Sequence, residues 1–243
     1  MPGRPRTAIV VGGTRRVGRW VSEALLVEGQ HVHAVFRSDG ESAAAFADEM
    51  QAAGYKLHTH RCDALDYDAM CKFAEQVAVE EGGIDILINA SGSAADGTIC
   101  GTDSATLSRV FDDNVLAVHN AVRACNRYLR IGGGSIVNFL STGNDSIRSY
   151  KAVAVYGAAK TALASYSRSL ARELAPDQVT VNCIALGITE LAAEGVPQFS
   201  AEHVPSGVLV SQREVAGAIW YLTGETARQT TGSVLTLSGG FGL

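Results

Sequence analysis

The sequence predicts a single α/β domain in which a parallel sheet is covered by helices on both faces. Its 243 residues fit one domain of this class. Short apolar stretches alternate with helical patterns from end to end, without a low-complexity linker or a detectable internal repeat. Strand–helix alternation of this kind is typical of parallel sheets that carry helices on both faces.

Seven stretches have the length and composition of short strands: 7–11, 31–36, 55–62, 84–89, 135–140, 179–185 and 233–237. Helical patterns fill the intervals near 17–29, 41–53, 66–81, 103–130, 153–175 and 211–223. Ligands of parallel sheets bind beyond the carboxyl ends of the strands. The residues that directly follow each strand are therefore the first candidates for function.

Composition and charge narrow the class of protein. Apolar residues make up 47% of the chain, and the net charge of −5 argues against a nucleic-acid or membrane-surface role. The five cysteines are scattered without a C-x-x-C pair, so the sequence predicts neither a metal site nor a disulfide scaffold. No apolar run approaches the roughly 18 residues of a membrane span, and none behind residues 1–6 suits a secretory signal. We expect a soluble, cytoplasmic protein.

The first strand is followed by a glycine-rich loop, Gly12-Gly13-Thr14-Arg15-Arg16-Val17-Gly18, that leads into a helix. Glycines let the backbone approach a phosphate, and the N-terminus of a helix favours negative charge. A P-loop would need Lys and Ser/Thr after its last glycine, where this chain has Arg19 and Trp20. A dinucleotide pyrophosphate loop is favoured over a plain turn, and we expect cofactor contacts at Gly12, Thr14, Arg15, Arg16 and Val17.

The second strand ends at Phe36 and is followed by Arg37 and Ser38. Dinucleotide-binding folds that use NAD place a carboxylate here for the ribose 2′-hydroxyl, whereas those that use NADP place a cation for the 2′-phosphate. Arg37 offers a fork of donors and Ser38 a hydroxyl, and Asp39 comes one position too late. These residues predict NADP(H), with a solvated arginine at a strand end as the alternative.

Polar residues also follow the third and fourth predicted strands. Asp63 and Ala64 come after the third, and Asn89, Ala90 and Ser91 come at the end of the fourth. We expect cofactor contacts at all five of these positions. Asp63 can accept a hydrogen bond from an adenine amino group, and Asn89 can also brace neighbouring strands. Ordinary turn chemistry explains each of them as well.

Tyr156 and Lys160 stand four residues apart in a predicted helix, so they project from one face, one turn apart. An ammonium close to a phenol favours the phenolate and lowers a pKa that is about 10 in water. The pair could thus act as a general acid or base, whereas the alternative is an ordinary surface pair. The fifth strand delivers Ser141 onto the loop that precedes this helix.

Two further features flank this pair in the sequence. Asn114 lies inside the long helical pattern 103–130, where asparagine is an indifferent helix former. It lies either on a solvated face or where its amide, or a freed backbone carbonyl, holds a water near the site. After the sixth strand, residues 190–210 are irregular and contain Pro197 and Pro205. We expect this segment to form a lid over the substrate.

Taken together, these positions resemble the short-chain dehydrogenase/reductase family over essentially the whole chain. The shared landmarks are the loop 12–18, Asp63, the Asn89 segment, Asn114, Ser141, the Tyr156-x-x-x-Lys160 motif, and the stretches 182–187 and 232–240. The resemblance implies a Rossmann-type doubly wound parallel sheet of about seven strands. It also implies an enzyme that passes hydride between a nicotinamide and a carbonyl or hydroxyl group.

The resemblance assigns a role to each candidate by position. Tyr156 would give its proton to the carbonyl oxygen, and Lys160 would lower the pKa of Tyr156 and bind the nicotinamide ribose. Ser141 would hydrogen-bond the substrate oxygen, and Asn114 would hold the water of a proton relay. Gly187 and Thr189 would contact the nicotinamide side of the cofactor.

Some residues depart from the family pattern. Arg16 replaces the middle glycine of the loop, as in the pteridine-reductase branch, and this again favours NADPH. That branch tends to carry Asp at the position of Ser141 and an aromatic residue near Ala94, and this chain has neither. Leu186 replaces the usual proline before Gly187, and the spacing from Ser141 to Tyr156 is longer than is common.

The sequence therefore predicts one NADP(H)-binding domain over residues 1–243 that reduces a ketone or a β-ketoacyl-type carbonyl. The substrate would be a small molecule, either free or attached to a carrier protein. Arg127, Arg130 and Arg172 are candidates for docking such a carrier, but solvated helix faces are the favoured explanation of these arginines. The alternatives are a pteridine or other C=N or quinone-type reductase of the same family, and a non-catalytic NADP(H) sensor. The resemblance also implies a homo-oligomer, most often a tetramer.

Overall fold

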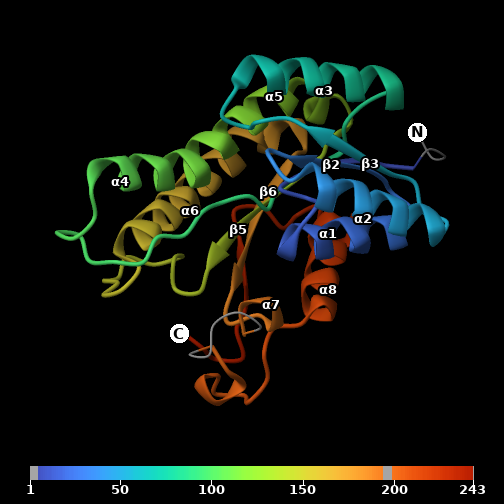
Figure 1. Cartoon of the computed structure of the whole chain (residues 1–243). Coiled ribbons are helices and arrows are strands. Elements are labelled where there is room, and N and C mark those ends of the chain that lie inside the picture. Colours follow the sequence, from blue (N-terminus) through green and yellow to red (C-terminus); the bar gives the residue numbers. More distant parts are fainter. Residues whose placement is uncertain (1–4, 194–198, 243) are drawn as a thin grey trace.

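A computed structural model describes residues 5–193 and 199–242 and shows one parallel sheet with helices on both faces (Figure 1). The strands lie in the order β3-β2-β1-β4-β5-β6-β7. The order reverses between β1 and β4, so this is a doubly wound sheet with its switch point there. The strands are β1 (Thr7–Val11), β2 (His31–Phe36), β3 (Leu57–Arg61), β4 (Ile86–Asn89), β5 (Ser135–Ser141), β6 (Thr180–Leu186) and β7 (Val234–Leu237).

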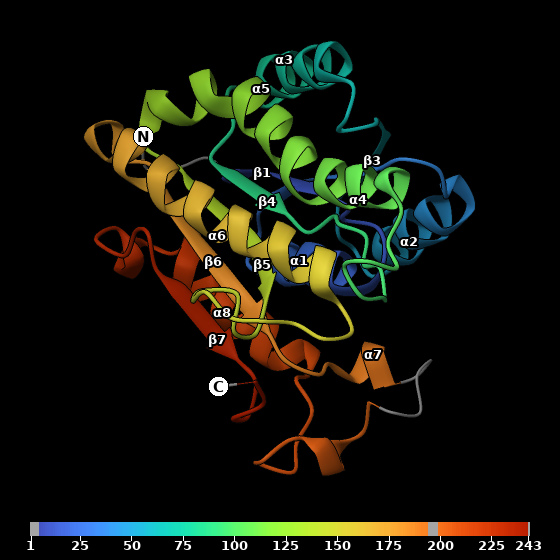
Figure 2. The ribbon, with the colours of Figure 1, turned by 90° about the vertical axis from the view of Figure 1, so that its left-hand side faces the viewer.

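Helices cover the two faces of the sheet in separate groups (Figure 2). One face carries α1 (Arg16–Val27), α2 (Gly40–Ala52) and α8 (Gln212–Thr223). The other face carries α3 (Tyr67–Glu81), α5 (Ala117–Gly132) and α6 (Ala154–Leu174), with α4 (Ser104–Phe111) beyond the sheet against α6. A short α7 (Glu190–Ala193) follows β6.

Each face of the sheet has its own hydrophobic core because successive side chains of a strand point to opposite faces. In β1, Ala8 and Val10 pack under α1 and α8, whereas Ile9 and Val11 pack under α3 and α5. All five residues of β1 are buried. Burial on both faces explains why this strand is a continuous apolar run in the sequence rather than an alternating one.

The seven strands expected from the sequence are all present, with ends that differ by at most two residues. The prediction of one long helix over 103–130 is wrong, because a π-helical turn at Asp112–Leu116 separates α4 from α5. A π-turn inserts one extra residue into the hydrogen-bond ladder, which a hydrophobic periodicity of 3.6 does not reveal.

The segment expected to be a lid, 190–210, contains α7 and a 3₁₀ turn at Ala201–His203, and its two ends are joined by a bridge between Thr189 and Val210. Pro197, one of the residues behind that expectation, lies outside the described residues. In the part of the chain that the structure describes, no helix has the length and apolarity needed to span a membrane.

Candidate active site

A cavity of about 570 Å³ opens at the carboxyl ends of the strands, around the point where the strand order reverses. The loops that follow β1, β2, β3, β4, β5 and β6 all contribute to it. The predicted site residues that line it are Gly12, Thr14, Arg15, Arg16, Val17, Arg37, Ser38, Asp63, Ala64, Ala90, Ser91, Ser141, Tyr156, Lys160, Gly187 and Thr189. The cavity therefore brings together residues from across the chain that the sequence had placed at one edge of the sheet.

The glycine loop after β1 is shaped by contacts that leave no room for side chains. Gly12 has a φ of +76°, and a Cβ there would lie 3.0 Å from the backbone of Ser91. A Cβ on Gly18 would lie 1.9 Å from the carbonyl oxygen of Gly12, so only glycine lets α1 start against the loop. No side chain among the described residues caps the N-terminus of α1, so its first N–H groups remain available. The loop thus fits an anionic pyrophosphate.

Charged residues lie beside this loop, where the adenosine end of a dinucleotide would be. Arg37 Nη1 lies 3.0 Å from Asp113 Oδ1, and Arg15 Nη1 lies 2.9 Å from Asp39 Oδ2. Arg16 is exposed, has a left-handed φ of +50°, and forms no ion pair within residues 5–193 and 199–242. Two of the three predicted arginines thus already have carboxylate partners.

Side-chain hydrogen bonds fix the loop that follows β3. Asp63 Oδ1 accepts from the Leu65 backbone N–H at 3.0 Å. From α5, Asn120 Nδ2 donates to the carbonyl oxygens of Ala64 and Leu65 at 3.0 and 3.1 Å. This arrangement fixes Ala64 and Asp63 at the wall of the cavity.

Asn89 does not line the cavity, and the cofactor contact expected there stays a prediction. Its side chain is 2% exposed, and its Nδ2 donates to Asn138 Oδ1 at 2.8 Å. Asn138 Nδ2 in turn donates to Ser167 Oγ at 2.9 Å. The chain of bonds ties β4 to β5 and α6, which is the bracing role that the sequence also allowed.

The strongest chemical feature of the cavity is a hydroxyl pair. The Ser141 hydroxyl, at the end of β5, donates to the phenolic oxygen of Tyr156, in the first turn of α6, over 3.1 Å. Each hydroxyl carries one proton that rotates about its C–O bond, so both O–H groups can turn toward a ligand oxygen that enters the cavity. The pair lines the cavity, so a substrate oxygen could contact both hydroxyls.

Lys160 lies one turn further along α6 and is only 4% exposed. Its Nζ donates to the carbonyl oxygen of Phe139 at 2.8 Å and lies 5.7 Å from the centroid of the Tyr156 ring. Burial lowers the pKa of Lys160 to about 8. The ammonium is therefore poorly solvated and has no carboxylate partner within the described residues.

The lowered pKa expected for Tyr156 is wrong for the structure as it stands. Burial raises the pKa of the Tyr156 phenol, and the hydrogen bond from Ser141 only partly opposes this. The Lys160 Nζ donates to the Phe139 carbonyl oxygen and not to the phenol. Tyr156 is consequently a neutral phenol at physiological pH, in the form of a proton donor.

Asn114 lies in the π-turn between α4 and α5, completely buried behind the cavity wall. Its Nδ2 donates to the carbonyl oxygens of Ser93 and Val110, both at 2.8 Å. Its Oδ1 has no hydrogen-bond partner among the described residues. A Cβ on Gly92 would lie 2.4 Å from this oxygen and 3.4 Å from Lys160 Nζ, so both atoms lie beside Gly92. The water relay expected at Asn114 stays a prediction.

Sequence reasoning missed two residues of the site. Asp113, which holds Arg37, lies next to Asn114 in a pattern that looked like an ordinary helix. Asn144 is 1% exposed, and its Oδ1 accepts from the Ser141 N–H at 3.1 Å. Its only signal was the long spacing between Ser141 and Tyr156, which implies a loop that needs internal support.

Residues 12–242 match the family model described as enoyl-(acyl carrier protein) reductase. The chain is 30% identical, over 97% of its length and 96% of the relative, to a 3-oxoacyl-[acyl-carrier-protein] reductase of Aquifex aeolicus. Among solved structures, a short-chain dehydrogenase/reductase from Serratia marcescens superposes with a TM-score of 0.90 at 28% identity, covering 100% of both chains. An actinorhodin polyketide ketoreductase in complex with NADPH gives 0.89 at 26% identity, covering 98% of this chain and 97% of that one.

Proposed function

Because this chain belongs to the short-chain dehydrogenase/reductase family, we propose that it is an NADPH-dependent reductase of a ketone or β-ketoacyl-type carbonyl group. The observation that carries the proposal is the 3.1 Å hydrogen bond between Ser141 and a protonated Tyr156 at the wall of the cavity. A donor phenol beside a second hydroxyl suits the reduction of a carbonyl, in which the oxygen gains negative charge and needs a proton.

In the proposed reaction, the carbonyl oxygen lies against Ser141 and Tyr156. NADPH, when bound, supplies the hydride that the carbonyl carbon receives. Tyr156 gives its phenolic proton to the oxygen, so that the C=O bond becomes CH–OH and the phenol becomes a phenolate. The ammonium of Lys160, buried one turn away, stabilises that negative charge, and Ser141 holds the oxygen in place.

The preference for the 2′-phosphate is supported by the arginines at the adenosine end of the cavity. Arg16 is exposed and has no ion-pair partner in the described ranges, so it can pair with a phosphate at once. Arg37 and Arg15 already form ion pairs with Asp113 and Asp39, so they contribute less binding free energy to the 2′-phosphate than unpaired arginines would. We propose that the phosphate competes with Asp113 for Arg37.

Arg127 and Arg130, two of the candidate docking arginines, form ion pairs with carboxylates of this chain, and this favours a free small ketone over a carrier-bound substrate. Arg130 lies 3.3 Å from Asp177 and 3.6 Å from Glu173, and Arg127 lies 3.8 Å from Glu75. These partners neutralise much of a patch that an acidic carrier would need. Because the Aquifex relative is named as a reductase of carrier-bound substrates, the experiment below also includes carrier-bound substrates.

The role of Tyr156 is tested by Tyr156→Phe, assayed with NADPH and a panel of free ketones and carrier-bound β-ketoacyl thioesters. Loss of the general acid should lower kcat by about 10²- to 10⁴-fold while NADPH binding, followed by fluorescence titration, changes little. The control is Tyr221→Phe, which alters an exposed tyrosine on α8 that bonds Thr230. Unchanged turnover in Tyr156→Phe would disprove the mechanism.

The cofactor preference is tested by two substitutions with opposite expected effects. Arg37→Ala should raise the KM for NADPH by about tenfold and leave that for NADH nearly unchanged, because only NADPH carries the phosphate. Asp113→Asn should lower the KM for NADPH, since it releases Arg37 from its partner. Arg213→Ala, on the exposed side of α8, is the control. Equal effects on both cofactors would contradict the assignment.

A further inference from the structure

Four of the six histidines in the chain gather on one side of neighbouring strands, away from the cavity. His31 and His33 belong to β2, and His58 and His60 belong to β3. The register pairs His33 with His58, so their side chains leave the same face of the sheet. Glu81, the last residue of α3, covers this face. All six histidines lie within the described residues.

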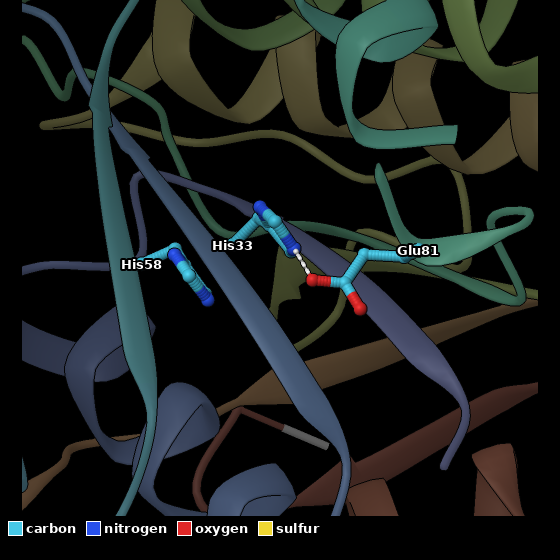
Figure 3. Close-up of side chains that lie close together, drawn as sticks. All are labelled: His33, His58 and Glu81. Carbon is cyan, nitrogen blue, oxygen red and sulfur yellow. Dashed lines mark hydrogen bonds and ion pairs between the residues drawn. The ribbon is translucent and has the colours of Figure 1, made fainter. Parts of the chain in front are cut away.

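The side chains meet closely enough to share a ligand (Figure 3). One donor atom from each of His33, His58 and Glu81 lies within 4.8 Å of the others. The rings of His33 and His58 are stacked with their centroids 4.8 Å apart, and His33 Nε2 lies 3.2 Å from Glu81 Oε1. His58 Nε2 is buried and has no hydrogen-bond partner in the part of the chain that the structure describes.

Two further residues hold these groups from behind. His31 Nδ1 lies 2.6 Å from Glu81 Oε2, and His60 Nε2 lies 3.0 Å from His33 Nδ1. Metal-ligating histidines and carboxylates are commonly oriented by a second group of this kind, which fixes the ring and its tautomer. His33 and Glu81 each have such a support, and the free nitrogen of His58 is the remaining donor.

We propose that His33, His58 and Glu81 form a binding site for one divalent metal ion such as Zn²⁺. Two imidazoles and one carboxylate are ligands that Zn²⁺ takes in proteins, with a fourth position left for water. The site is separate from the carbonyl-reducing cavity, and it does not rest on the proposed function.

The hydrogen-bond pattern allows the metal-free and metal-bound forms without placing a charge on His33. Without a metal, His33 Nε2–H donates to Glu81 and His60 Nε2–H donates to His33 Nδ1. With a metal, the proton moves to His33 Nδ1 and is donated to His60 Nε2, which frees His33 Nε2 for the ion. Only the tautomers of two rings change.

Coordination requires a small movement of one ligand. Two atoms bound to one ion at about 2.1 Å can be at most about 4.2 Å apart, whereas the farthest pair here lies up to 4.8 Å apart. His33 is fully buried and fixed by His60, but His58 is only partly buried and its reachable nitrogen makes no bond. A rotation of the His58 ring closes the site.

The experiment titrates the full-length protein, free of any purification tag, with Co²⁺ and Zn²⁺. We expect one Co²⁺ per chain with the visible absorption of a four-coordinate ion, displacement by Zn²⁺, and a higher Tm on binding. His58→Gln and Glu81→Gln should each weaken the affinity for Zn²⁺ at least tenfold. Neither His58 nor Glu81 is part of the two hydrophobic cores, so both variants should fold.

His119→Gln is the matched control, because His119 is a histidine on α5 that contacts Tyr166 outside the cluster. It should bind metal like the wild type. Absence of stoichiometric binding in the wild type would overturn the proposal, as would unaltered affinity in both His58→Gln and Glu81→Gln. In either case the cluster would be a hydrogen-bonded support between β2, β3 and α3.

Discussion

At the scale of single residues, the most unusual group is the buried ammonium of Lys160. It is 4% exposed, its Nζ bonds one backbone carbonyl, and no carboxylate within the described ranges balances its charge. An isolated buried charge costs free energy, which appears here as a pKa lowered to about 8. A residue that is unfavourable for folding but placed beside Tyr156 is typical of a site whose chemistry needs it.

Lys160→Met should therefore stabilise the protein while abolishing turnover. Removing the buried charge returns about 3 kcal/mol at neutral pH, and losing the bond to the Phe139 carbonyl takes back about 1 kcal/mol. The net gain of about 2 kcal/mol should be visible in urea unfolding at pH 7. Lys72→Met, which removes an exposed lysine on α3, should leave stability and activity nearly unchanged.

The sign of the pH dependence follows from the direction of that shift. The pKa of Lys160 is about 8 in the folded protein against an ordinary value of 10.5, so between these pH values the unfolded chain binds more protons. The stability of the wild type consequently rises across this window, and the advantage of Lys160→Met shrinks as the pH approaches 10.5. An advantage of equal size at pH 7 and pH 10 would contradict the depressed pKa.

At the scale of elements, two irregular segments aim the functional side chains. The π-turn at Asp112–Leu116 presents Asp113 to Arg37 and carries Asn114, whose oxygen, unpaired among the described residues, lies beside Gly92. Single π-turns inside α-helices are frequent at functional sites. The turn thus supplies one residue to the ion pair with Arg37 and one beside Gly92 in the cavity wall.

The second irregular segment is the loop between β5 and α6, which Asn144 holds from inside. Its Nδ2 donates to Tyr150 Oη at 2.6 Å and to the Gly157 carbonyl at 3.2 Å, and its Oδ1 accepts from the Ser141 N–H. The same side chain therefore supports Ser141 and the start of the helix that carries Tyr156.

Asn144→Ala should lower kcat about tenfold or more and destabilise the fold by about 2 kcal/mol. The loss leaves buried polar groups unpaired and releases Ser141 from its position next to Tyr156. Steady-state kinetics and thermal unfolding measure the two effects, and the KM for NADPH should change little. Ser146→Ala, on the same loop but outside these bonds to Ser141 and Gly157, is the control. A normal kcat in Asn144→Ala would show that the loop positions nothing.

At the scale of the whole molecule, the two candidate sites lie at different places along the strands of the parallel sheet. The carboxyl ends of its strands carry the cavity, the hydroxyl pair and the arginines, whereas the histidine cluster lies further back along β2 and β3 under α3. In a parallel sheet every strand ends at the same edge, so loops far apart in the sequence meet there. The fold can therefore hold two sites that share no residue.

The outer face formed by α4, the π-turn, α5 and α6 should pair with copies of itself (Figure 2). Leu107, in α4, and Leu116, in the π-turn, are 46% and 42% exposed. With the family resemblance, this predicts a tetramer, with a mass about four times the chain mass of 25.5 kDa in light scattering. Leu116→Glu should reduce that mass, and Val79→Glu, exposed on α3, should not. A monomeric wild type would contradict the prediction.

The sequence by itself determined the strands, their parallel arrangement, and the positions of the glycine loop, Ser141, Tyr156 and Lys160. These features depend on local periodicity and on which residues follow each strand, and both are written in short stretches of sequence. The cofactor class and the carbonyl chemistry could be proposed from them, and the cavity brings the same residues together.

Only the tertiary structure decided what those residues experience. It paired Arg37 with Asp113, turned Lys160 toward the Phe139 carbonyl, raised the pKa of Tyr156 by burial, and bonded Asn89 to Asn138. It also brought four histidines and Glu81 together from two strands and a helix end. Burial, charge pairing and long-range contact depend on neighbours distant in sequence, so no local pattern could reveal them.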